Sequence, residues 1–314
     1  MSEQRTATAP ATGADHARAR EWARRLGSVG VWTHDVERMP TAAAREYARA
    51  VEALGFDALW IPESLGSKEA FAHAGILLAA TSTLVIATGI ANIWARDAVA
   101  MANGGRALVD AYPDRFLLGL GVSHAPTVKT RGQSYARPVE HMREYLDAMD
   151  VAPYVGPKVD VPRVLAALGP RMLRLAAERT LGAHSYFVPV EHTAVARKEL
   201  GDGLLLAVEQ AAVLSDDPAA ARQAARRHMK RYLDLDNYTS NLRRLGWSDA
   251  NLADGGSDRL VDAVVAWGGP GALRQRIGHH KARGADHVCI QILRVDLAAP
   301  PVPELERVAR AALL

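Results

Sequence analysis

The chain has 314 residues, of which 49% are hydrophobic and 23% charged, and this balance excludes disorder, collagen and a continuous coiled coil. Its only cysteine, Cys289, excludes an intramolecular disulfide framework and fits a reducing cytoplasm. The 38 Lys and Arg residues are nearly matched by 35 Asp and Glu without long runs of one sign, so nucleic-acid binding is not expected.

The first 24 residues are rich in Ala, Thr and Arg, and we expect residues 1–24 to form a mobile extension that is helical near its end. A twin-arginine signal at Arg24-Arg25 is not expected, because the following stretch, Leu26–Trp32, is short, contains two glycines and predicts a strand. Residues 25–314 are expected to form a single domain.

The stretch Ala70–Ala95 has no Asp, Glu, Lys or Arg over 26 residues, which is long enough to cross a bilayer. His73, Thr88 and Asn92 interrupt its apolar character, and a Thr-Ser-Thr turn divides it. The pattern predicts a helix followed by a buried strand, so no association with a membrane is expected.

Short β-branched runs alternate along the chain with longer Ala-, Leu- and Arg-rich stretches, which is typical of βα units with a parallel sheet. The predicted strands are Ser28–Trp32, Ala58–Ile61, Leu84–Thr88, Phe116–Leu120, Arg163–Ala167, His184–Val188, Leu204–Ala207 and His287–Ile292. Eight such strands indicate a closed (β/α)₈ barrel of the α/β class, the TIM-barrel architecture.

Two of the predicted helices have clear boundary signals. Apolar residues repeat at helical spacing over Thr41–Leu54, and Gly55 ends the pattern. Ser215–Pro218 predicts the beginning of a helix that runs to about Leu233, with the proline in its first turn.

Two stretches fit neither strand nor helix, namely Val122–Arg137 after strand four and Asp234–Ser257 after strand seven. In a (β/α)₈ barrel the loops after the strands lie at the catalytic end. Both insertions are therefore candidates for contact with a substrate or cofactor.

The run Gly105–Val122, together with Thr88-Gly89-Ile90 and Arg96, resembles the luciferase-like monooxygenase superfamily. The finer patterns Ala91–Arg96, Gly121–Pro126 and Glu191-His192-Thr193 are similar to its actinobacterial branch of coenzyme F420-dependent oxidoreductases. The resemblance extends over residues 26–314.

This resemblance implies a bacterial luciferase-like enzyme that uses the reduced deazaflavin F420 to transfer hydride to a small organic substrate. The alternatives are an FMN-dependent monooxygenase of the same barrel and a non-catalytic protein that binds a flavin or deazaflavin. Relatives also imply a homodimer, with Ala70–Ala79 and Val99–Val109 as the candidate interface, and the cysteine content leads us to expect a cytoplasmic protein.

For the cofactor ring, the resemblance implies a non-proline cis peptide at Gly89–Ile90 behind the deazaflavin. The alternative is an ordinary glycine at a strand end. Gly121, with Gly119, either leaves room for the ring at the barrel mouth or allows close packing at the rim.

For the phosphate of the cofactor, the resemblance and helix-start chemistry indicate two places. Gly169 and Pro170 open a helix after strand five, followed by Arg171. His192 and Thr193 follow strand six. The alternatives are that Thr193 is only a helix cap and that Arg171 is a solvated surface charge.

The candidate catalytic residues are His124 and Glu63, at the ends of strands four and two. Several relatives have Asp-His where this chain has Glu63-Ser64, and serine cannot replace histidine as a base. Either Glu63 or His124 therefore handles the proton, or the reaction differs. The structural alternatives are that His124 only shapes the pocket and that Glu63 only caps the following turn.

The remaining candidates line the expected substrate pocket. Trp32, His34 and Trp94 lie at strand ends near the mouth, although Trp32 equally suits the core. Asn237, Tyr238 and Asn241, with Arg244, belong to the second insertion. No metal site is expected, because His279 and His280 point about 100° apart on a helix and no carboxylates complete a set.

Overall fold

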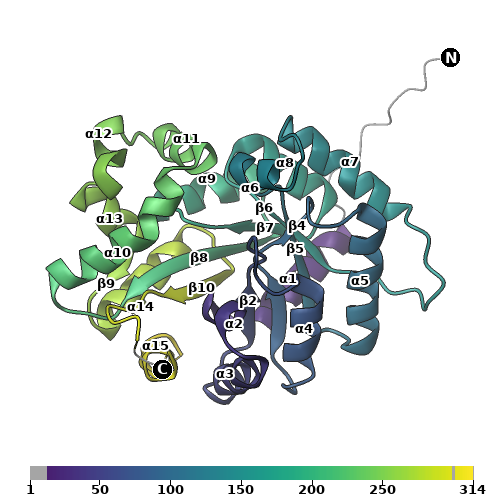
Figure 1. Ribbon diagram of the computed structural model, residues 1–314, viewed down its shortest axis with the longest axis horizontal. Coiled ribbons are helices and arrows are strands. Elements are labelled where there is room, and N and C mark those ends of the chain that lie inside the picture. The colour runs from purple at the N-terminus through teal and green to yellow at the C-terminus, as the bar shows by residue number, and fades with distance from the viewer. Residues whose placement is uncertain (1–12, 299–300, 314) are drawn as a thin grey trace.

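The computed structural model describes residues 13–298 and 301–313 as alternating strands and helices (Figure 1). The strands that form the barrel are β1 (Val29–Trp32), β2 (Ala58–Ile61), β3 (Val85–Thr88), β5 (Phe116–Gly121), β6 (Arg163–Ala166), β7 (Gly182–Ser185), β8 (Leu205–Val213) and β10 (His287–Ile292). They pair in parallel in this order, and β10 pairs with both β1 and β8. The predicted closed (β/α)₈ barrel is confirmed.

The helices surround the strands on the outside of the barrel (Figure 1). They are α1 (Gly13–Leu26), α2 (Asp35–Arg38), α3 (Thr41–Ala53), α4 (Ala70–Leu78), α5 (Ala98–Ala111), α6 (Ala125–Thr130), α7 (Pro138–Asp150), α8 (Pro170–Arg179), α9 (Val190–Leu200), α10 (Pro218–Leu233), α11 (Asp236–Arg244), α12 (Asp249–Leu252), α13 (Asp258–Val264), α14 (Pro270–Ala282) and α15 (Val302–Ala312). Within the described residues, none of them is long and apolar enough to cross a membrane.

The described part of the expected N-terminal extension is a helix rather than a mobile segment. α1 begins at Gly13, and its apolar residues Ala19, Trp22 and Leu26 are buried in the main core. These residues lie on one face of the helix at three- and four-residue spacing, so burial fixes α1 to the barrel. The helix expected near the end of this stretch is present, and residues 1–12 lie outside the described residues.

Two strands differ from the sequence-based expectation by more than one residue at an end, and four others differ by a single residue. The sixth strand, expected over His184–Val188, is β7, which begins at Gly182 and ends at Ser185. The backbone turns at Phe187, whose φ is +56°, so the apolar residues after the strand belong to a loop. The seventh strand continues past Ala207 to Val213, because Glu209 and Gln210 are buried rather than exposed at a strand end, and the Gln210 side chain bonds the Val264 carbonyl and His280 of α14.

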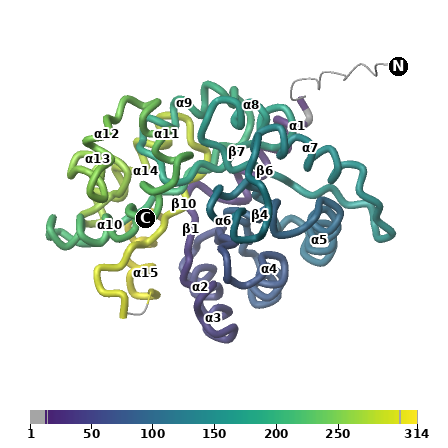
Figure 2. The backbone as a smooth tube through the Cα atoms, turned by 45° about the horizontal axis from the view of Figure 1, so that its top comes forward, coloured from purple at the N-terminus to yellow at the C-terminus, as the bar shows by residue number. Residues whose placement is uncertain are grey.

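The two insertions lie where they were expected, after β5 and after β8. The first contains α6, which both views place beside the strand ends, near β4 (Ala91–Asn92) (Figures 1 and 2). The second contains α11 and α12, which with α10 and α13 form a lobe on one side of the barrel (Figure 2). A further short strand, β9 (Ala266–Trp267), pairs with β8.

Between β3 and β4 the chain carries one residue more than the neighbouring strand. Ala87 pairs with Leu117 and Ala91 pairs with Leu120, so four steps along one strand match three along β5. This mismatch is a β-bulge. At the bulge the Thr88 hydroxyl accepts a hydrogen bond from the Gly119 N–H at 2.9 Å and donates one to the Gly119 carbonyl at 2.8 Å.

Two histidine side chains and a tryptophan side chain lie together in the interior of the barrel. His184 stacks on Trp60 with ring centroids 4.4 Å apart, and the Trp60 indole N–H donates to His287 Nε2 at 3.0 Å. Because Nε2 accepts, His287 carries its proton on Nδ1, which donates to the Gly27 carbonyl at 2.8 Å. Burial lowers the pKa of His184 to about 3 and that of His287 to about 4.

These buried histidines make the fold sensitive to mild acid. Burial likewise lowers the pKa values of other histidines to about 3 or 4, namely His73, His192, His228 and His280. The unfolded chain, with histidine pKa values of about 6.5, therefore binds more protons than the folded chain as the pH falls. Glu209, whose pKa burial raises to about 8, opposes this effect by one proton.

We expect the free energy of unfolding to fall between pH 7.5 and 5.5 by about 1.4 kcal/mol for each histidine that stays neutral. Glu209 offsets part of this loss, and the loss for a given histidine is complete only below the pKa that it has in the folded protein. Urea unfolding at pH 7.5, 6.5 and 5.5 measures it. Equal free energies at the three pH values would contradict the assignment of neutral buried histidines.

Candidate active site

A cavity of about 970 Å³ opens at the carboxyl ends of the barrel strands. Its wall includes most of the residues that the sequence predicted, namely Trp32, His34, Glu63, Gly89, Ile90, Gly121, His124, Gly169, Pro170, Asn237 and Tyr238. They come from the ends of β1, β2, β3, β5 and β6 and from the second insertion. Fold and cavity together define a barrel enzyme with its site at the usual end.

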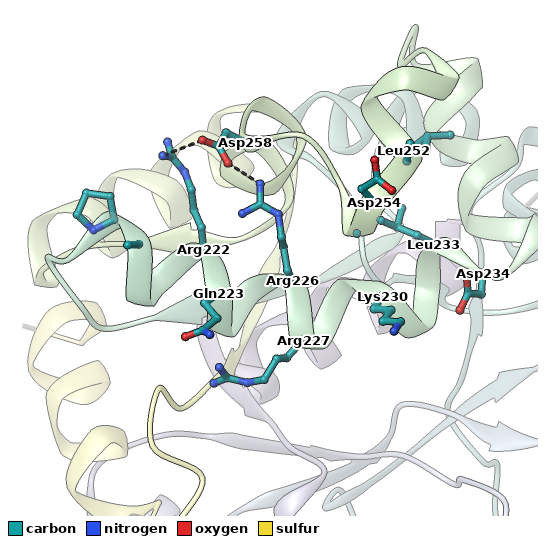
Figure 3. A pocket seen from close by; sticks show the side chains of 14 residues that line it. Arg222, Gln223, Arg226, Arg227, Lys230, Leu233, Asp234, Leu252, Asp254 and Asp258 are labelled. Atoms are coloured by element: carbon teal, nitrogen blue, oxygen red, sulfur yellow. Dashed lines mark hydrogen bonds and ion pairs between the residues drawn. The ribbon is translucent and has the colours of Figure 1, made fainter.

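A second hollow lies along the outer face of α10 and shares none of its described lining residues with the barrel cavity (Figure 3). Arg222 and Arg226 project into it, and both form ion pairs with Asp258 (Figure 3). Arg222 also pairs with Asp262. Because these charges are matched, the hollow offers less to an anionic ligand than its arginines suggest.

Two predicted phosphate-binding residues lie outside the barrel cavity. Thr193 is fully buried, and its hydroxyl shares a hydrogen bond of 2.7 Å with His280 Nδ1. His192 is also fully buried and donates from Nε2 to the Leu168 carbonyl at 2.9 Å. Both serve the packing of α9, so their expected direct contact with a phosphate is corrected.

Two predicted pocket residues support the wall from behind instead of lining it. The Trp94 indole N–H donates to the Val122 carbonyl at 2.9 Å, and its ring stacks on His141 at 4.2 Å. Asn241 is buried, and its Oδ1 accepts from Arg244 Nη2 at 3.1 Å. Trp94 thus fixes the first insertion, and Asn241 orients an arginine that does line the cavity.

The start of α8 and Arg244 form the most suitable place for an anionic group. Gly169 is the N-cap residue of α8 and Pro170 its first residue, so the helix N-terminus opens on the cavity. A Cβ on Gly169 would stand 3.4 Å from Arg244 Nη2. The positive end of the α8 dipole and the Arg244 guanidinium would therefore both attract an anion at the same place.

The Gly89–Ile90 peptide is cis, which confirms the expectation drawn from the resemblance. A Cβ on Gly89 would stand 2.5 Å from Trp32 Nε1, so a side chain here would cover the indole. A Cβ on Gly121 would overlap the Ile90 side chain, and one on Gly119 would overlap the Thr88 carbonyl. Close packing at the rim therefore explains both strand glycines.

His124 joins the two insertions at the cavity wall. Its Nδ1 lies 3.1 Å from Asn237 Oδ1, and its ring lies 5.5 Å from that of Tyr238. Burial lowers its pKa, and the Arg231 charge adds to this, while the bond to Asn237 opposes it. At neutral pH His124 is thus an uncharged hydrogen-bonding group rather than a ready acid.

Glu63 is occupied by an ion pair. Arg96 donates to both carboxylate oxygens, and the Asn92 backbone N–H donates to Oε2 at 2.8 Å. The Glu63 side chain is only 6% exposed, and Arg96 also pairs with Glu69. The carboxylate therefore ties the end of β2 to the segment after β4.

The sequence did not reveal a tyrosine pair at the cavity wall. Tyr186 donates its hydroxyl hydrogen to Gln291 Oε1 at 2.9 Å, and its oxygen lies 2.7 Å from the Tyr232 hydroxyl. The Tyr186 ring also packs at 4.9 Å from Trp32. The available signal was that Tyr186 directly follows β7. Because the predicted strand extended to Val188, Tyr186 was assigned to the strand and not to the cavity wall.

The family model described as luciferase-like monooxygenase matches residues 25–287. A 5,10-methylenetetrahydromethanopterin reductase from Methanolobus tindarius is 26% identical over 261 residues, covering 74% of this chain and 78% of the relative. The chain therefore belongs to the luciferase-like monooxygenase family, and it is an oxidoreductase of that family.

Two solved structures share the fold. One is an F420-dependent secondary alcohol dehydrogenase in complex with an F420-acetone adduct, with a TM-score of 0.73, 18% identity and coverage of 90% of this chain and 98% of that one. The other is the oxygenating constituent of 3,6-diketocamphane monooxygenase from Pseudomonas putida in complex with FMN, with a TM-score of 0.65, 16% identity and coverage of 90% and 95%. The barrel thus carries both cofactors in other proteins.

We expect Glu63→Gln to act mainly on stability, because it leaves the half-buried Arg96 without its principal partner. The loss should be about 3 kcal/mol in urea unfolding. The control is Glu69→Gln, since Glu69 contacts the same arginine from a half-exposed position and should cost less than about 1 kcal/mol. A fully stable Glu63→Gln protein without activity would instead support the catalytic interpretation.

Proposed function

We propose that this enzyme binds coenzyme F420 in the barrel cavity and transfers hydride between the cofactor and a small organic substrate. The observation that carries the proposal is an unpaired hydrogen-bond donor in the cavity wall beside Gly89. There the Trp32 indole N–H, on a side chain only 2% exposed, has no hydrogen-bond partner within the described part of the chain. A buried donor at a cavity wall calls for an acceptor from a ligand.

The residues present fit the other parts of such a cofactor. The cis Gly89–Ile90 segment gives a wall without a side chain at residue 89, which suits a planar ring. The start of α8 and Arg244 suit a phosphate. When bound in its reduced form, the cofactor supplies a hydride, and the protein supplies orientation, exclusion of water and proton transfer.

The arginines at the cavity favour F420 over FMN. Arg38, Arg231 and Arg244 line it, and so does Arg171, which is paired with Glu140. Such a set exceeds what one FMN phosphate requires, whereas the polyglutamyl tail of F420 carries several carboxylates. The sequence similarity to a 5,10-methylenetetrahydromethanopterin reductase and the fold shared with an F420-dependent alcohol dehydrogenase support the same choice. FMN-dependent monooxygenase chemistry is the alternative, supported by the FMN-bound fold relative.

The first test is a titration of the purified protein with F420 and, separately, with FMN, followed by fluorescence at matched salt. We expect saturable binding of F420, weakened at least about tenfold by Arg244→Gln because a charge-assisted contact is lost. Arg243→Gln is the matched control, since Arg243 pairs with Asp249 on the surface. Binding of FMN alone would favour the monooxygenase, and binding of neither would contradict the proposed function.

We also propose a homodimer through α4 and α5. These helices pack against each other, and Val99 on α5 is 39% exposed. A Val99→Arg variant should sediment as a monomer where the wild-type protein sediments as a dimer in analytical ultracentrifugation. Val195→Arg, at an equally exposed apolar position on α9, is the control. A wild-type monomer at all concentrations would contradict this prediction.

A further inference from the structure

The end of β1 carries an ion pair that the sequence did not reveal. His34 Nδ1 lies 3.0 Å from Glu37 Oε2, and both side chains line the barrel cavity. The Ser64 hydroxyl reaches the same carboxylate at 3.2 and 3.3 Å. The pair is sheltered, because the Glu37 side chain is 6% exposed and that of His34 is 17% exposed.

This geometry fixes where the proton of the imidazole lies. A carboxylate only accepts hydrogen bonds, so Nδ1 of His34 must carry a hydrogen. The other ring nitrogen, Nε2, is buried and finds no partner among residues 13–298 and 301–313. It is therefore the atom through which His34 can exchange a proton with a ligand, while Glu37 stabilises the charged ring.

The neighbouring Trp32 completes a hydrogen-bonding site for an oxygen. Its ring meets that of His34 edge to face, with centroids 4.7 Å apart. The Trp32 indole N–H is likewise without a partner in the described part of the chain. Two adjacent side chains thus offer one permanent donor and one nitrogen that either donates or accepts, which suits a carbonyl group and the corresponding alcohol.

We propose that His34 and Glu37 form the catalytic dyad that transfers the proton of this reaction, with a carbonyl compound or its alcohol as the substrate class. This inference rests on the proposed function. When a hydride reaches the carbonyl carbon, its oxygen takes the electron pair of the C=O π bond. The Nε2–H bond of the doubly protonated His34 breaks, the O–H bond forms, and the electron pair stays on Nε2. Glu37 keeps its hydrogen bond to Nδ1–H, and water returns the proton.

Other titratable groups at the cavity are less suited to this step. Glu63 has both oxygens engaged by donors, and burial lowers the pKa values of His124 and His184. Tyr186 donates its hydroxyl hydrogen to Gln291, and burial raises the pKa of Tyr186 well above the usual value. Among these residues only His34 has its Nδ1 bonded to a carboxylate while its Nε2 has no partner within the described part of the chain.

The charges around the dyad come from several elements. The Lys68 ammonium, held by the Val36 and Met39 carbonyls at 2.7 Å, acts on Glu37 from the segment after β2. Glu37 interacts electrostatically with His73 of α4 and with Tyr232 of α10. His34 interacts electrostatically with His228, which also belongs to α10. Of these groups, the Glu37 carboxylate is the one that is hydrogen-bonded to the His34 ring.

The test compares His34→Asn, which keeps a donor toward Glu37 but removes Nε2, with Glu37→Gln and with the surface control His279→Asn. F420-loaded proteins are assayed with acetone and 2-cyclohexenone as acceptors and isopropanol as donor. We expect His34→Asn to lower kcat by about 10²–10⁴-fold with F420 affinity within about threefold of wild type. Glu37→Gln should shift the basic limb of the kcat/KM profile for ketone reduction to lower pH.

Chemical rescue separates catalysis from a merely structural role. Added imidazole should restore turnover of His34→Ala in proportion to its concentration, which a capping role for His34 does not explain. Turnover of His34→Asn within about threefold of wild type would overturn the dyad. So would a loss of F420 affinity that matches the loss of turnover.

A titration followed by proton NMR tests the proposal if the wild-type protein binds F420 but turns over none of these probes. The His34 Cε1–H signal, assigned with His34→Asn, should move on addition of F420 and titrate at lower pH in Glu37→Gln. An unmoved signal, or an unchanged titration, would overturn the dyad. Absence of F420 binding in the fluorescence titration would count against the proposed function instead, so the two failures are distinguishable.

Discussion

The hydroxyl of Thr88 bridges the N–H and the carbonyl of Gly119, and the shape of the barrel mouth depends on this bridge. It satisfies two buried backbone groups at the point where β3 leaves the regular ladder. The extra residue of the bulge then brings Gly89 and Ile90 into the cavity wall. Gly119 must lack a side chain, because a Cβ there would overlap the backbone carbonyl of Thr88.

Hydration and partners, rather than residue type, decide what each histidine of this barrel can do. His184 and His287 lie in the interior, where burial keeps them neutral and makes them packing and hydrogen-bonding groups. His34 lies at the cavity wall, where Glu37 bonds one ring nitrogen and the other, which is buried, has no partner within the described residues. One kind of side chain therefore serves stability in the interior and, in our proposal, proton transfer at the mouth.

The order of elements could be predicted because each βα unit has its own local signals. Ala58–Ile61 and His287–Ile292 were predicted with the observed bounds, since each run begins directly after an aspartate, Asp57 or Asp286. The sixth strand was misplaced, because Phe187 is apolar and buried yet lies in a turn. The seventh was cut short, because a buried Glu209 is indistinguishable from an exposed glutamate in the sequence alone.

The site was predictable only as far as backbone position determines it. The cis Gly89–Ile90 peptide followed from a motif, because a motif fixes the course of the backbone. The function of a side chain depends on its partner, and partners are distant in sequence. Glu63 is a poor proton donor because Arg96, 33 residues away, occupies it. His34 gains a chemical role because a short helix returns Glu37 to its ring, which is a matter of side-chain direction that no strand-end motif records.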